Sequence, residues 1–157
     1  MIREKLRNIL YAKDSPRKVA LSFAVGTFIG VSPFLGFHTV IILAVAWMFR
    51  LNKVVALTAA YITNPLTLIP IYTFCIWFGA VLLGVDITAV KVNWDEFSMT
   101  ILFSELKVIV APFFLGTTIL GSIGAVASYY PVKAAVIKAH AMDEQNGLPV
   151  PGKEAED

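Results

Sequence analysis

Three long stretches without a charged residue divide the chain into blocks. They run from Val19 to Phe49, from Val54 to Val85 and from Val108 to Val132. An apolar stretch of about 18 or more residues without charges is typical of a membrane-spanning helix. The pattern therefore predicts an all-α, polytopic helical membrane protein whose membrane domain covers residues 19–132.

The first block is too long to be one straight span. As a single helix its 31 residues would measure about 46 Å, whereas the hydrocarbon core of a bilayer is about 30 Å thick. In its middle, Pro33 removes a backbone donor and disfavours helical geometry at Ser32, and Gly36 adds a permissive position. We expect two half-helices, residues 19–31 and 37–49, joined at this break.

The second block repeats this design 32 positions later. Asn64-Pro65 falls where Ser32-Pro33 falls, and Pro70 is predicted to close the second break. Backbone groups freed at such breaks must be buried in protein or line a wet cavity, because lipid offers them no partner. We expect two Pro-broken helical hairpins, either re-entrant or crossing, and one further transmembrane helix in the third block.

Polar side chains at the two breaks are the candidate substrate-binding residues. They belong either to a site built from discontinuous helices near the membrane middle or to kinked helices whose polar groups satisfy their own backbone. These side chains are Ser32, His38, Thr39, Asn64 and Thr67. An ionisable residue inside a membrane is a functional candidate by default, and for His38 the alternative is a hydrogen bond to the broken backbone.

The segments outside the blocks have their own patterns. Residues 1–18 carry six bases and repeat apolar residues with helical spacing, which indicates either a basic amphipathic helix on the membrane surface or a soluble stub. Ser15-Pro16 is predicted to cap and open the next helix. An amphipathic stretch is predicted near residues 93–103, and a separate helix after Pro131 in the cytoplasmic segment 133–157, followed by a disordered acidic tail.

The composition agrees with a membrane protein. Apolar residues make up 57% of the chain, charged residues 15%, and the mean hydropathy is +0.74, whereas a soluble domain is about 45–50% apolar and about 25% charged. Disordered proteins, nucleic-acid-binding domains and ordinary cytosolic enzymes are thereby excluded. The blocks contain no carboxylate pair, and the single Cys75 makes no disulfide, so we expect no enzymatic activity, cofactor or metal.

The distribution of Lys and Arg indicates the orientation. If the first block re-enters and the others cross, eleven bases lie on the side of the N-terminus and two on the other. The division is eight to five if every block crosses, and ten to three if both broken blocks return. The excess of bases in cytoplasmic loops favours the first arrangement, whereas the repeated pattern favours the third. Either way, we expect a cytoplasmic N-terminus in the bacterial inner membrane.

Several glycine, proline and polar motifs occur in a recognisable order. Gly26-x-x-x-Gly30-x-x-Pro33-x-x-Gly36-x-His38-Thr39 precedes Arg50-Leu51-Asn52, then Asn64-Pro65-x-Thr67-x-x-Pro70-x-Tyr72, then Gly79. Over Ser15 to Ser128, the chain thus resembles the bacterial membrane family called domain of unknown function two-zero-six-two. The family has no agreed activity, and many members carry Gln at the position of His38. Some members are fused to glycosyltransferase-type domains, which implies a link to lipid-linked sugars or envelope lipids.

Two functions fit these observations. The first is a small transporter, or a protein that translocates a lipid or lipid-linked intermediate, in which Arg50 and Lys53 contact an anionic headgroup; alternatively these bases only anchor the loop. The second is a non-catalytic membrane anchor or assembly partner for an envelope glycolipid enzyme. The expected partners are membrane lipids, such an enzyme, and further copies of this chain, because so few helices enclose no pathway alone.

Overall fold

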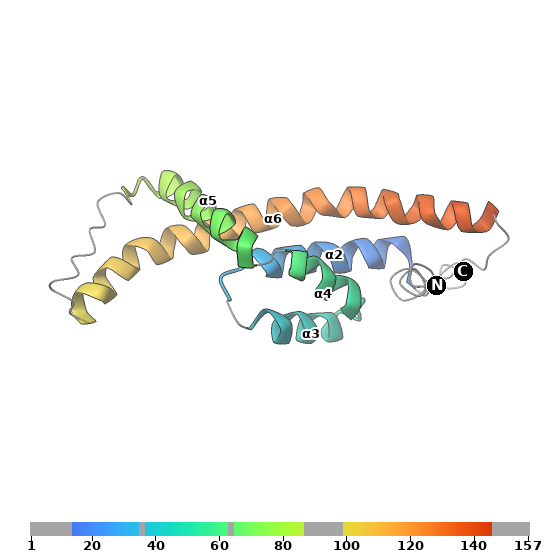
Figure 1. Ribbon diagram of the computed structural model, residues 1–157, viewed down its shortest axis with the longest axis horizontal. Helices are drawn as coiled ribbons and strands as arrows, with labels where there is room; N and C mark the ends of the chain where they lie inside the picture. Colours follow the sequence, from blue (N-terminus) through green and yellow to red (C-terminus); the bar gives the residue numbers. More distant parts are fainter. Residues whose placement is uncertain (1–13, 35–36, 63–64, 87–98, 146–157) are drawn as a thin grey trace.

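The computed structural model describes residues 14–34, 37–62, 65–86 and 99–145 of the chain. Within these ranges it is all-helical, as expected, and Figure 1 shows an elongated molecule. The helices are α2 (Pro16–Val31), α3 (His38–Met48), α4 (Lys53–Ile62), α5 (Pro65–Leu83) and α6 (Met99–Gln145). The predicted N-terminal amphipathic helix and the acidic tail lie outside the described residues.

Helix α6 is the longest of the described helices, and both α5 and α2 pack against it. Helix α5 packs along its first part (Figure 1). Gly79 lies against the backbone of Pro112, and Gly116 lies against the backbone of Cys75, so close that a Cβ on either glycine would overlap a carbonyl oxygen. Residue numbers rise along α5 while they fall along α6, so the two helices are antiparallel. Glycine makes this approach possible because it has no side chain between the two backbones.

Helix α2 packs along the second part of α6, also antiparallel. Phe28 lies against Gly121, and nearer the N-terminus of α2 Val19 forms a buried cluster with Val136 and Val55. Helices α5 and α2 therefore pack one after the other along α6, and the end of α2 lies beside the first turns of α5.

The other side of α2 is covered by α4, with α3 outside both (Figure 1). Asn52 bonds to Ser22, and Gly26 lies against Ala56, so α4 runs parallel to α2. Helix α3 turns back along α2, because its residues Ile42 and Val45 pack in one cluster with Ile29 of α2 (Figure 1). The chain therefore reverses between α2 and α3 and again between α3 and α4.

The first break lies where the sequence predicts it. Helix α2 ends at Val31, α3 begins at His38, and Pro33 falls between them. Ser15 caps α2, since its Oγ accepts a bond of 3.4 Å from the Lys18 amide, and Pro16 is the first helical residue. Gly36 lies outside the described residues.

The second block differs from the prediction. Pro65 opens α5, but Pro70 lies inside that helix and closes no break. Helices α4 and α5 both run parallel to α2, so the block contains no hairpin. Pro70 costs its helix one backbone bond, but the close packing of α5 on α6 keeps the following turns helical.

The third block is also longer than predicted. Helix α6 is continuous from Met99 to Gln145 and contains both Pro112 and Pro131, so no separate helix begins after Pro131. Its stretch Val108–Gln145 is long and apolar enough to cross a membrane, the one such stretch among the described helices. Contacts on both sides of Pro131 hold the helix in line, since α2 packs against Gly121 and Val136 alike.

The α5–α6 contact generates a test of stability. Gly116→Ala places a methyl group against the Cys75 carbonyl and is expected to lower the free energy of unfolding by about 2 kcal/mol. The control is Gly124→Ala, where the new Cβ meets only Thr27 Cγ2 at 3.8 Å and the helix gains propensity. Thermal unfolding of the purified variants measures both, and equal stability of the two would contradict the close packing.

Candidate functional site

The break after α2 gathers polar groups from three helices around one backbone oxygen. The Ser32 carbonyl comes after the last helical turn, so no backbone donor of α2 reaches it. The Tyr72 hydroxyl of α5 donates to this oxygen at 3.0 Å. His38 Nε2 of α3 lies 3.2 Å from the same oxygen, and the tautomer protonated at Nε2 donates to it. Ser32 is thus a meeting point of α2, α3 and α5.

Local chemistry explains why α2 ends here. Pro33 holds Ser32 in an extended conformation, with φ −66° and ψ 154°. The Ser32 hydroxyl, which is buried, donates to the Ile29 carbonyl at 2.6 Å, and the Ser32 amide donates to the same carbonyl at 3.1 Å. The side chain therefore helps to satisfy the end of its own helix, as one of the two interpretations of the sequence expects.

Of the four predicted polar residues that the structure describes, two lie together, Ser32 and His38. Thr39 lies away from Ser32, with its Oγ1 at 3.2 Å from the Tyr61 hydroxyl in an exposed position, and Thr67 is exposed on α5. Asn64 lies outside the described residues. Tyr72 was not among the candidates, although it stands two positions after Pro70 in the motif that begins at Asn64-Pro65.

Arg50 and Lys53 lie at the other end of α3, both exposed. Arg50 has a left-handed backbone, with φ 51°. Its amide bonds to the Trp47 carbonyl at 3.3 Å, and the Leu51 amide bonds to Ala46 at 2.8 Å, which is the Schellman arrangement that ends a helix.

The neighbouring Asn52 has a structural role. Its side-chain oxygen accepts bonds of 3.1 Å from the Val54 and Val55 amides and so caps α4. Its amide nitrogen donates to Asp14 at 2.7 Å, and its backbone amide donates to the fully buried Ser22 at 2.8 Å. This network ties the start of α2 to the α3–α4 turn.

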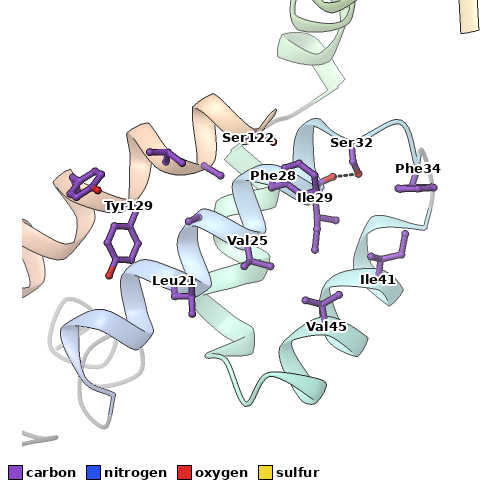
Figure 2. Close-up of a pocket in the computed structure, with 14 residues that line it drawn as sticks. Leu21, Val25, Phe28, Ile29, Ser32, Phe34, Ile41, Val45, Ser122 and Tyr129 are labelled. Carbon is purple, nitrogen blue, oxygen red and sulfur yellow. Dashed lines mark hydrogen bonds between the residues drawn. The ribbon is translucent and has the colours of Figure 1, made fainter. Parts of the chain in front are cut away.

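An open apolar groove of about 640 Å³ runs along α2, from Leu21 near the start of the helix to the break at Ser32. Figure 2 shows Leu21 and Tyr129 at one end of the groove, and Ser32 and Phe34 at the other. Helix α2 forms its floor, and α3 and α6 form its walls. Its lining residues are Leu21, Ala24, Val25, Phe28, Ile29, Ser32, Phe34, Ile41, Val45, Ser122, Ala125, Val126, Tyr129 and Tyr130. Such a groove suits an apolar chain.

Comparison with known proteins gives one match. The family model described as "Uncharacterized protein conserved in bacteria (DUF2062)" matches residues 1–145. No curated protein and no solved structure matches the chain. Among the described residues, no group of three or more His, Cys, Asp or Glu side chains is arranged to hold a metal ion.

The contacts at Ser32 predict that the same substitution at two tyrosines changes the stability of the protein by different amounts. Tyr72→Phe removes the half-buried bond to the Ser32 carbonyl and is expected to lower the free energy of unfolding by about 1 kcal/mol. Tyr61→Phe removes the exposed contact with Thr39 and should cost less than half as much. Thermal unfolding of the two variants compares them, and a larger effect at Tyr61 would refute the importance of the Ser32 bond.

Proposed function

Since the chain belongs to an uncharacterised bacterial family, DUF2062, which supplies no activity, we propose from its geometry that it is an integral protein of the cytoplasmic membrane that translocates a lipid or lipid-linked intermediate. It does so without catalysing a reaction, and in assemblies of more than one copy. The observation that carries the proposal is the polar break at Ser32, which adjoins an apolar groove.

The distribution of side chains by size supports a membrane location. The buried residues are mostly small, and several of the largest apolar residues are exposed: Trp47 is 75% exposed, Ile69 72% and Phe37 67%. Soluble monomers rarely expose large contiguous apolar patches. Helices in lipid, by contrast, pack through small residues because burial from lipid yields no hydrophobic gain.

The charges support the same location. Four bases border the end of the molecule where Val19 packs against Val136: Lys18, Arg50, Lys53 and Lys133. At the other end, the charged residue Asp86 follows the last turn of α5. Between these ends, the uncharged residues 108–132 of α6 measure about 37 Å, enough to cross a hydrocarbon core of about 30 Å.

The break lies near the middle of that uncharged stretch. One turn beyond the contact between Phe28 and Gly121, Ser32 comes level with Thr117. The middle of residues 108–132 is Leu120. Helix α2, with 16 residues, is about 24 Å long and does not cross the hydrocarbon core alone.

These relations lead to a topology in which α2 and α3 enter and return, α4 and α5 cross together, and α6 crosses back. Residues 1–18, 50–53 and 133–157 then share one side with eleven bases, against two in residues 86–107. The positive-inside rule makes the first side cytoplasmic. A lipid tail would follow the groove while its headgroup passes the polar groups at Ser32, His38 and Tyr72.

Cysteine labelling tests the topology. On a Cys75→Ala background, an impermeant thiol reagent should label Lys53→Cys and Lys138→Cys from the cytoplasmic side and Asp86→Cys from the outside. The reagent is applied to intact cells and to inverted vesicles, which expose opposite faces of the membrane. A variant that is labelled in only one preparation serves as the control for a variant that is labelled in the other. Labelling of Lys53→Cys and Asp86→Cys from one side would overturn the topology.

A vesicle assay tests translocation. The protein is reconstituted with a fluorescent lipid, and an impermeant quencher reports how fast lipid from the inner leaflet becomes accessible. Replacing Tyr72 by Phe and His38 by Ala together should slow translocation by about tenfold or more, because two hydrogen-bonding groups are lost. Tyr61→Phe should match the unaltered protein.

Membrane abundance is measured in parallel, so a loss of rate at equal abundance supports translocation. If the unaltered protein moves no lipid, or if the double variant moves it equally fast, the proposal fails. A role as anchor or assembly partner for an envelope enzyme would then take its place.

A further inference from the structure

We infer that the groove along α2 binds one chain of a lipid with an anionic phosphate headgroup, and that Arg17 and Lys133 bind the headgroup. The inference rests on the proposed membrane location and adds a ligand class and two residues to it. Neither base was among the candidates from the sequence.

The groove has the length of one membrane leaflet. Its lining on α2 extends from Leu21 to Ser32, a distance of about 16 Å along the helix. Half of a hydrocarbon core of about 30 Å is about 15 Å. One lipid chain that lies straight in the groove would therefore end near the break, in the middle of the membrane.

The lining of the groove is apolar along most of its length and more polar at one end, as a lipid has an apolar chain and a polar headgroup. Between its ends it is almost wholly apolar, with Val25 and Phe28 on the floor and Ile41 and Val45 on one wall (Figure 2). At the end near Leu21 it carries Tyr129 and Tyr130. Tyrosine is enriched where membranes meet water, so this end is the headgroup end.

Two bases stand at that end. Arg17 precedes Leu21 by four residues and therefore shares its face of α2, and Lys133 follows Tyr129 by four residues on α6. Neither forms an ion pair in the part of the chain that the structure describes, whereas the adjacent Lys18 is paired with Asp14 at 2.5 Å. A phosphate between Arg17 and Lys133 would supply a negative charge that pairs with both bases.

The bases predicted from the sequence, Arg50 and Lys53, are a rival pair. They lie at the same end of the molecule, but no residue of α4 or of the turn at residues 49–52 lines the groove. Removing either pair removes two positive charges, so a comparison of the two separates a specific site from a general attraction.

The test measures binding to the full-length protein in detergent by native mass spectrometry. The probes are phosphatidylglycerol and phosphatidylcholine with identical chains. Phosphatidylglycerol should bind the unaltered protein at least about tenfold more tightly. Replacing Arg17 and Lys133 by Gln should weaken its binding by about twenty-five-fold, since each base near an anionic headgroup contributes a factor of about five. The Arg50→Gln/Lys53→Gln variant should retain the preference.

A second pair of variants tests the groove itself. Ala125 lines the groove, whereas Ala127 is exposed two residues further along α6 and does not. Ala125→Phe should weaken the binding of both lipids, and Ala127→Phe should leave it unchanged. Thermal unfolding of all four variants confirms that each is folded before its binding is compared.

Several results would overturn the inference: equal affinity for the two lipids, loss of the preference only in the Arg50/Lys53 variant, or equal effects of Ala125→Phe and Ala127→Phe. Binding is measured at equilibrium and requires no transport. Failed translocation with selective lipid binding therefore refutes only the proposed function, whereas unselective binding with active translocation refutes only this inference.

Discussion

The close approach of α5 and α6 determines much of the remaining structure. At Gly79 and Gly116 the two backbones touch with no side chain between them. The contact places Tyr72, one turn before Cys75, against Phe113 with ring centroids 4.9 Å apart. From there its hydroxyl reaches the Ser32 carbonyl. A wider spacing of α5 and α6 would move that hydroxyl away from the end of α2.

The end of α2 links the backbone chemistry to the groove. Ser32 contributes the carbonyl that Tyr72 and His38 approach, and it also closes one end of the apolar groove. A helix that ends inside apolar surroundings needs partners for its last carbonyls. The same requirement concentrates polar groups at this point, and such a concentration beside an apolar surface suits a molecule with a polar head and an apolar tail.

The opposite end of α2 is held by a different kind of contact. Asp14, Ser22 and Asn52 form a hydrogen-bonded network that joins the start of α2 to the start of α4. Asn52 satisfies two amides of α4 at the same time, so the Arg50-Leu51-Asn52 motif is explained by structure without a ligand. In the network Asp14 pairs with Lys18, and Arg17 forms no ion pair with any residue that the structure describes. A base is therefore available at the end of the groove where a headgroup would lie.

The sequence by itself determined the all-helical class of the described residues and the positions where helices begin and end at Ser15, Pro33 and Pro65. These follow from local chemistry, since a proline lacks an amide hydrogen and restricts the residue before it. Only the tertiary structure decided that Pro70 and Pro131 stay inside helices, because packing on both sides of a proline can outweigh one lost bond. It also decided that the second block does not reverse and that Tyr72 reaches Ser32. Those outcomes depend on contacts between residues far apart in the sequence, from Ser32 and Tyr72 to Val19 and Val136, which no local pattern encodes.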